Sequence, residues 1–91
     1  GKEGHVQPVS VVMPIRNEEK HLRAAVARVR EQHYPGDLEL LLCVAPSEDQ
    51  THRLAEELAA EDPRVVVLDN PTGYTPAGLN IGIRRARHDV I

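Results

Sequence analysis

Apolar residues along this chain fall into short continuous runs that alternate with longer stretches of helical period. Three runs cover residues Val9 to Met13, Leu38 to Ala45 and Arg64 to Leu68, and a fourth begins at Asp89. Short aliphatic and β-branched runs of this kind are typical of parallel strands that are buried on both faces. The pattern predicts four strands separated by three helices, in the order β-α-β-α-β-α-β.

The segment after the first strand has the pattern of an amphipathic helix. Asn17 is predicted to cap its amino terminus, and Glu18 and Glu19 to lie in its first turn, where negative charge is favourable. Tyr34 to Asp37 is predicted to end it as a turn. The apolar stripe that would face the sheet consists of Leu22, Ala25, Val26 and Val29.

Two further helices follow the second and third strands. Ser47 is predicted to cap a helix from Glu48 to Ala60, with Gln50 completing a capping box. Thr75 is predicted to cap the last helix, with Pro76 at its first position. The packing of this last helix is assigned to Leu79, Ile81, Ile83 and Ala86. Its two glycines, Gly78 and Gly82, are four residues apart and indicate close approach to a neighbouring element.

Alternating strands and helices predict the α/β class, with right-handed crossovers and a three-layer, Rossmann-like parallel sheet. All three strand-to-helix junctions should then lie along one edge of that sheet. Ligands of open α/β folds bind at this edge, where helix amino termini favour anionic or polar groups. The junctions are residues 14–18, 45–49 and 70–75.

Length and charge narrow the function classes. Ninety-one residues make one small domain, which we place at residues 8–91, and residues 1–7 resemble a mobile tail or a cloning remnant. A net charge of −3 gives no general attraction to nucleic acid. The arginines at positions 84, 85 and 87 fit either the last turn of a helix or a phosphate contact. Cys43 fits a small buried hydrophobe, and the chain is compatible with a reducing compartment.

Several site types are disfavoured by missing motifs. No G-x-G-x-x-G follows the first strand, and no glycine-rich loop ends in Gly-Lys-Ser/Thr. The five histidines lack metal-ligand spacing, and no base stands beside Ser47 in the sequence. Glu18 fits either a helix-start charge or a hydrogen-bond acceptor for a nucleoside. Asp49 is similarly divided and favours a structural role.

Three segments of the chain resemble segments of a known enzyme family and follow one another in the same order. They are VSVVMPIRNEEKHLRAAVARV, DLELLLCVAPSEDQTHRLAEEL and RVVVLDNPTGYTPAGLNIGIRRARHDVI. Together they resemble the amino-terminal, nucleotide-sugar-binding half of family-two inverting glycosyltransferases with the GT-A fold. The PAGLN segment is most similar to the corresponding segment of bacterial enzymes that build exopolysaccharides or cell-surface glycans.

The resemblance implies a set of donor-binding positions. Pro14, Ile15, Arg16 and Glu18 would lie against the nucleoside, Asn17 would shape the turn, and residues 70–80 would lie near the base and diphosphate. The complete set implied for this chain is Pro14, Ile15, Arg16, Asn17, Glu18, Ala45, Ser47, Asn70, Gly73, Tyr74 and Asn80.

The chain departs from the family pattern at two places. Val44 and Ala45 stand where the family has an acidic pair that contacts the base, which puts a uridine donor in doubt. Tyr74 stands where a basic residue often follows the loop glycine. It fits either stacking on a base or covering the loop.

By this resemblance, the chain is part of an enzyme that transfers a sugar from a nucleotide-sugar donor to a hydroxyl of a glycan or lipid-linked acceptor. The divalent metal of such an enzyme, Mn²⁺ or Mg²⁺, and its catalytic base are expected beyond Ile91, so these 91 residues are expected to hold no metal and to be inactive alone. We expect a cytoplasmic location, for the longer protein at the membrane face. The alternatives are a non-catalytic α/β module that binds nucleotide or protein, and self-association through an exposed sheet edge.

Overall fold

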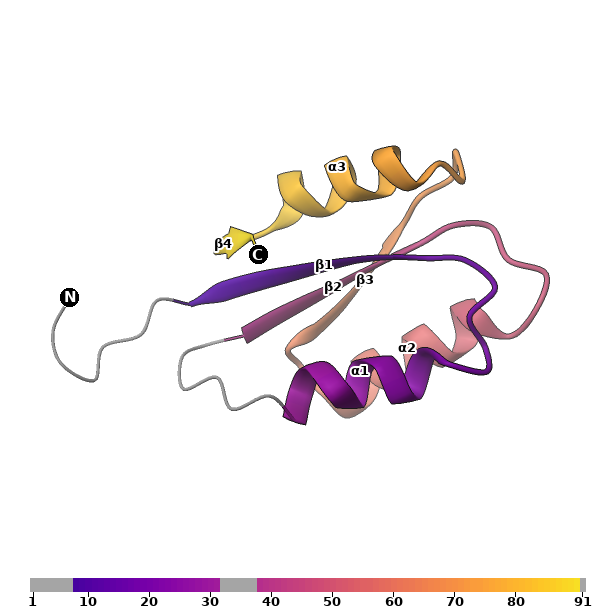
Figure 1. The fold of residues 1–91 in the computed structure, drawn as a ribbon, viewed down its shortest axis with the longest axis horizontal. Helices are drawn as coiled ribbons and strands as arrows, with labels where there is room; N and C mark the ends of the chain where they lie inside the picture. The colour runs from indigo at the N-terminus through magenta and orange to yellow at the C-terminus, as the bar shows by residue number, and fades with distance from the viewer. Residues whose placement is uncertain (1–7, 32–37, 91) are drawn as a thin grey trace, which may run out of the picture.

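The structure is a computed structural model, and it describes residues 8–31 and 38–90. Seven elements follow one another along these residues (Figure 1): β1 (Val9–Ile15), α1 (Leu22–Glu31), β2 (Leu38–Val44), α2 (Thr51–Glu61), β3 (Val65–Asp69), α3 (Thr75–Arg85) and β4 (Asp89–Val90). The predicted order of strands and helices is confirmed. The predicted tail at residues 1–7 and the turn at Tyr34 to Asp37 lie outside the described residues.

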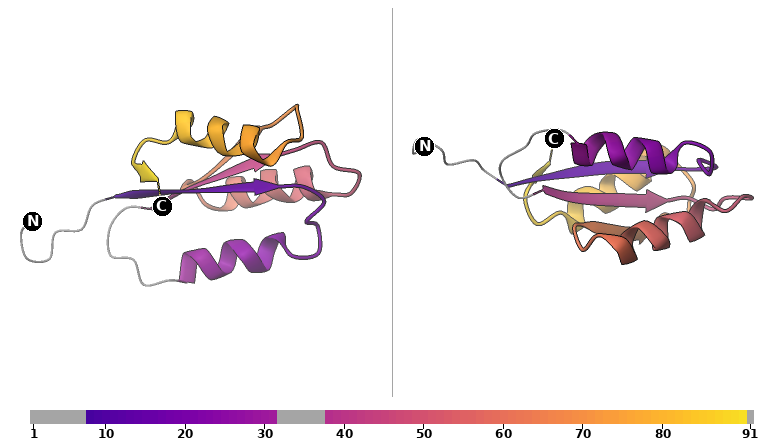
Figure 2. Two further views of the ribbon diagram at one scale, coloured as in Figure 1. Left: turned by 45° about the horizontal axis from the view of Figure 1, so that its top comes forward. Right: turned by 90° about the horizontal axis from the view of Figure 1, so that it is seen from below.

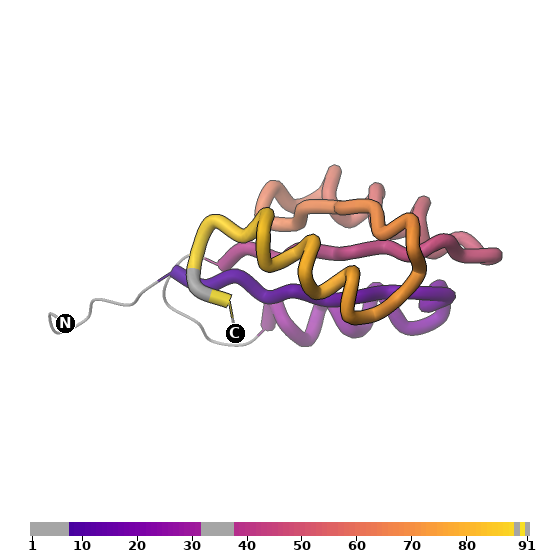
Figure 3. Tube along the Cα trace, turned by 90° about the horizontal axis from the view of Figure 1, so that it is seen from above, coloured from indigo at the N-terminus to yellow at the C-terminus, as the bar shows by residue number. Residues whose placement is uncertain are grey.

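The four strands form one parallel sheet in the order β3-β2-β1-β4. Helices α1 and α2 lie on one face of the sheet and α3 lies on the other (Figure 2). Figure 3, seen from the side of α3, shows this helix running above β1 and β2. The α/β class and the three-layer, parallel arrangement predicted from the sequence are therefore confirmed.

The main core lies between the sheet and the pair α1 and α2. It is aliphatic, as the scarcity of aromatic residues requires, and Leu42 and Val26 are fully buried in it. The predicted stripe of α1 faces this core, with Leu22 and Val26 buried. The buried members of the core are Ile15, Leu22, Val26, Leu40, Leu42, Val44, Ala55, Leu58 and Val65.

Helix α3 approaches the other face of the sheet through its two glycines, as predicted. A Cβ atom at Gly82 would collide with the side chain of Val12 and lie 3.0 Å from Cys43 Sγ. Cys43 is fully buried, as predicted. The assignment of Leu79 and Ile83 to the packing of α3 is wrong, because they are 39% and 52% exposed. The close contact at the glycines leaves these longer side chains on the outer flank of the helix.

Several predicted boundaries are also wrong. β1 continues through Pro14 to Ile15, because its parallel pairing with β2 continues to Ile15, which lies opposite Val44. Helix α1 begins at Leu22, so Asn17 does not cap it, and its first turn contains no acidic residue. Instead, the Glu18 carbonyl accepts hydrogen bonds from the amides of His21 (3.0 Å) and Leu22 (2.8 Å), which form a turn that leads into the helix.

The starts of the other two helices also differ from the predictions, α2 beginning later and α3 one residue earlier. α2 begins at Thr51 without a side-chain cap, so Ser47 and Gln50 form no capping box. Thr75 is the first residue of α3 rather than its cap, and Tyr74 occupies the cap position. The side chains predicted as caps make other contacts, described below.

Asp62, at the carboxyl end of α2, anchors the turn into β3. Its carboxylate accepts hydrogen bonds from the Arg64 amide (2.9 Å), Nε (3.2 Å) and Nη2 (2.9 Å), and Arg30 Nη1 lies 3.6 Å away. The Arg64 side chain, its amide and the charge of Arg30 together hold the pKa of the Asp62 carboxyl below its usual value, although burial opposes this.

A depressed pKa in the folded state stabilises the fold at every pH above the unfolded-state pKa, which is about 3.9 for aspartate. That contribution is lost as the pH falls through the folded-state pKa. We therefore expect Asp62→Asn to reduce the loss of stability as the pH falls below about 4, measured by urea unfolding at a series of acidic pH values. Glu31→Gln, at an exposed position at the end of α1, is the control. An acid response of Asp62→Asn equal to that of the unaltered chain would contradict this role.

Candidate functional site

The three strand-to-helix junctions meet at one edge of the sheet. The carbonyl of Ile15 accepts a hydrogen bond from the Ala45 amide (2.9 Å), and the carbonyl of Val44 accepts one from the Asn70 amide (2.9 Å). These bonds continue the sheet ladder into the loops, so that the loops lie side by side. Between them lies a recess of about 220 Å³, lined by Pro14, Ile15, Arg16, Glu18, Ala45, Asn70, Gly73 and Thr75.

The first junction turns sharply at Asn17, whose φ of 49° places it in the left-handed region. Asparagine adopts this region more readily than most residues. The Asn17 amide donates to Ser47 Oγ (3.1 Å), and Asn17 Oδ1 accepts from the Glu48 amide (2.9 Å). Ser47 Oγ in turn donates to the Ala45 carbonyl (3.0 Å). Asn17 and Ser47 thus join the first loop to the second.

Three more hydrogen bonds extend this connection between the two loops. The Glu18 amide donates to Thr51 Oγ1 (2.8 Å), the Glu19 amide to Asp49 Oδ2 (3.2 Å), and the Gln50 amide to Glu19 Oε1 (3.2 Å). The Thr51 hydroxyl also donates to Asp49 Oδ1. That hydroxyl, followed by the Thr51 and Glu19 amides, holds the pKa of the Asp49 carboxyl below its usual value. Asp49 therefore has the structural role that the sequence favoured.

Glu18 takes part in this connection through its backbone amide. Its carboxylate is not committed to the contact between the loops, and Glu18 lines the recess together with Arg16. One wall of the recess therefore carries one cationic and one anionic side chain. Carboxylates accept hydrogen bonds from hydroxyl groups, and guanidinium groups pair with phosphate oxygens.

The third junction is organised by Asn70, which is buried. Its Nδ2 donates to the Tyr74 carbonyl (2.8 Å), and its Oδ1 accepts from Thr72 Oγ1 (2.8 Å). Gly73 supplies the left-handed φ of 77° that the loop needs before α3. These contacts hold the amino terminus of α3 at the rim of the recess.

The remaining residues predicted from the resemblance lie outside this recess. Tyr74 is 73% exposed, and Asn80 lies on the exposed surface of α3. Ser47 and Asn17 form part of the loop framework described above. Thr75 lines the recess; the sequence placed it in the third junction and as a helix cap, but not among the individual donor-binding residues. Thr51 was also missed as a support of the site. The one feature of the sequence that indicated this role for Thr51 was the Ser-x-Asp-x-Thr spacing after the second strand.

A second recess, of about 260 Å³, adjoins the first, since Ala45 and Asn70 line both. His52 Nε2 on its rim lies 3.5 Å from Glu56 Oε2 and 3.6 Å from Asp69 Oδ1. The two recesses lie side by side at the carboxyl ends of β1, β2 and β3, and we refer to them together as the cleft. The residues that line this second part are Val44, Ala45, Pro46, His52, Asp69, Asn70 and Pro71.

The described parts of the chain, residues 8–31 and 38–90, contain no group of three or more His, Cys, Asp or Glu side chains arranged to hold a metal ion. These described residues thus do not fit the divalent metal that the family resemblance implies, and we assign no step to one. Over the same residues, every helix is too short or too polar to cross a bilayer.

Comparisons with known proteins agree with this geometry. The model of the family described as glycosyl transferase family 2 matches residues 10–91. The chain is 36% identical over 70 residues to the succinoglycan biosynthesis protein ExoA of Rhizobium meliloti. The aligned segment covers 77% of this chain and 21% of that protein. It is 31% identical over 84 residues to an uncharacterized glycosyltransferase of Haemophilus influenzae, covering 91% of this chain and 33% of that protein.

The chain thus spans about a fifth to a third of the length of these two relatives. The family match, by contrast, covers nearly all of the sequence and includes all three loops of the cleft. The chain therefore belongs to glycosyl transferase family 2.

Proposed function

We propose that this chain forms the donor-binding part of a glycosyltransferase that moves a sugar from a nucleotide-sugar to a hydroxyl acceptor in the synthesis of a surface polysaccharide or glycan. The observation that carries the proposal is the cleft in which all three strand-to-helix junctions meet. Membership of the family and the similarity to the succinoglycan biosynthesis protein of Rhizobium meliloti support it.

The two parts of the cleft match the two ends of a nucleotide. Val44, Ala45, Pro46 and Pro71 give the second recess largely apolar walls, which suit the flat face of a base. The first recess carries Arg16 and Glu18 and lies at the amino terminus of α3. In this arrangement Glu18 accepts hydrogen bonds from ribose hydroxyls, and Arg16 and the α3 terminus attract the diphosphate.

These residues bind and orient the donor. Negative charge grows on the diphosphate as it leaves the sugar, and a fixed cation such as Arg16 stabilises that charge. We assign no catalytic base to this chain.

Three further proposals concern the longer enzyme. They are the use of Mn²⁺ or Mg²⁺, a glycan or lipid-linked acceptor, and a place at the cytoplasmic membrane face. Pairing of the β4 edge with a second copy is a further proposal, which size measurement at high concentration tests.

Titration calorimetry of the 91-residue chain with nucleoside diphosphates of different bases tests donor binding. We expect weak binding that does not depend on Mn²⁺. Arg16→Ala should lower the affinity for nucleoside diphosphates about tenfold, or ~1.4 kcal/mol. Glu18→Gln should weaken the binding of nucleosides and of nucleotides equally, because the proposed partner of Glu18 is the ribose, which both contain. Arg28→Ala, at an exposed position in α1, is the matched control.

Two outcomes would contradict the proposal. One is the absence of binding for every nucleotide by a chain that is folded. The other is binding that Arg16→Ala and Arg28→Ala weaken equally, since this would indicate a general charge effect rather than a site.

A further inference from the structure

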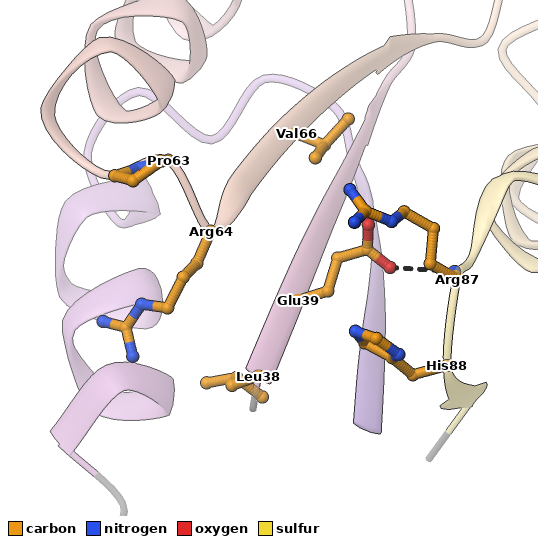
Figure 4. A pocket seen from close by; sticks show the side chains of 7 residues that line it. All are labelled: Leu38, Glu39, Pro63, Arg64, Val66, Arg87 and His88. Atoms are coloured by element: carbon orange, nitrogen blue, oxygen red, sulfur yellow. Dashed lines mark hydrogen bonds between the residues drawn. The ribbon is translucent and has the colours of Figure 1, made fainter. Parts of the chain in front are cut away.

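A buried carboxylate lies at the opposite edge of the sheet from the cleft. Glu39, the second residue of β2, is only 6% exposed. Burying an ionised carboxylate is costly unless hydrogen bonds compensate for the lost water. Figure 4 shows the Glu39 side chain between the strands and the segment that carries Arg87 and His88. Neither the fold class nor donor binding accounts for a charge at this position.

Glu39 and its neighbour Ser10 bind two consecutive backbone amides. Glu39 Oε1 accepts hydrogen bonds from Ser10 Oγ (2.8 Å) and from the Arg87 amide (3.0 Å; Figure 4). Ser10 Oγ accepts one from the His88 amide (3.2 Å). Ser10 is fully buried and lies opposite Glu39 in the ladder between β1 and β2. Two adjacent buried side chains thus hold the connection between α3 and β4.

The surroundings keep this carboxylate charged. Burial opposes ionisation, but the Arg87 amide, the Ser10 hydroxyl and the side chains of Arg87 and His88 hold the pKa of Glu39 below its usual value. Hydrogen bonds to an ionised acceptor are about twice as strong as neutral ones. Glu39 lines a recess at this edge of the sheet together with Arg64 and Val66. The Arg64 side chain points away from Glu39 (Figure 4) and binds Asp62 instead.

The bound amides lie directly before β4. β4 pairs with β1 over two residue pairs, Asp89 with Val9 and Val90 with Ser10. So short a pairing has little strength of its own, and a shift by one residue would turn every side chain of the strand to the other face. Ser10 is both a partner in this pairing and a member of the buried network. The network therefore fixes the strand at the point where its register begins.

We propose that Glu39 is a positioning residue, which acts with Ser10 to hold the connection after α3 and to set the register of β4 against β1. β4 is parallel to β1, whose carboxyl end carries Pro14 and Ile15 to the cleft. The register of β4 decides how far along β1 each of its residues lies. Glu39 thus acts at the end of the sheet far from the cleft, without contact with a donor.

Amide hydrogen exchange of the 91-residue chain, followed by NMR, tests this role. In Glu39→Ala we expect the Arg87 and His88 amides to exchange at least tenfold faster relative to the Leu42 amide in the centre of the sheet. Glu39→Gln keeps an acceptor oxygen and should restore part of the protection. Ser10→Ala should release the His88 amide more than the Arg87 amide.

The control is Val66→Ala, which changes the same recess without touching the network. A purely structural loss of stability would speed exchange at Leu42, Arg87 and His88 together, as we expect for this control. If Glu39→Ala does not fold, Glu39→Gln and Ser10→Ala carry the test. The proposal is overturned if neither variant changes the exchange of Arg87 and His88 relative to Leu42. These variants leave Arg16 and Glu18 unchanged, so the result is independent of donor binding.

Discussion

Gly82→Val should lower the free energy of unfolding by about 3 kcal/mol, at the upper end of the usual cost of overpacking a core. A Cβ atom at this position would already collide with Val12, and the two γ-methyl groups of valine would need still more room. Val12 lies in β1, in the middle of the sheet, and Cys43 behind it is fully buried. Room for the new side chain therefore requires Val12 to change rotamer or β1 to move. Chemical denaturation at neutral pH measures the loss.

Asn80→Val is the matched control, because Asn80 lies on the exposed surface of the same helix. Valine and asparagine have similar helix propensities, while valine is somewhat better than glycine. Propensity therefore predicts little change at Asn80 and a slight gain at Gly82. Val12→Ala removes the γ-methyl groups in the way, and should recover part of the stability lost in Gly82→Val. A stable Gly82→Val chain would show that α3 does not approach the sheet as closely as described.

Asn70→Ala is expected to affect both the fold and the cleft. It removes the hydrogen bonds to the Tyr74 carbonyl and from Thr72, and its site is buried. Leaving buried polar groups without partners costs about 1–3 kcal/mol each. Because Asn70 lines both recesses, we also expect nucleotide affinity to fall about tenfold, ~1.4 kcal/mol. Denaturation and calorimetry measure the two effects separately.

A graded series distinguishes the contribution of each hydrogen bond. Asn70→Asp keeps the acceptor for Thr72 but places an oxygen against the Tyr74 carbonyl, so its loss should approach that of alanine. Thr72→Val removes the hydroxyl from an exposed residue and should cost less. Equal effects of Thr72→Val and Asn70→Ala would show that the Asn70 amide group does not organise the loop.

Hydrophobic spacing alone determined the order of the elements, the parallel sheet and the face that α1 buries. Each is a consequence of how apolar residues must be arranged to leave water, so the run in β2 and the stripe containing Leu22 and Val26 were sufficient. The position of the cleft followed as well, since parallel strands bring their carboxyl ends to one edge. The spacing of Gly78 and Gly82 also indicated correctly how α3 meets the sheet.

Only the tertiary structure decided where α1 and α2 begin and which polar side chains act across the loops. A local pattern makes Asn17 and Ser47 plausible caps for their own helices, but each bonds to the loop of the other, about 30 residues away. Glu39 likewise finds its partner 48 residues along the chain. A short polar side chain satisfies a near or a distant amide equally well, and only the folded chain brings the distant amide within reach.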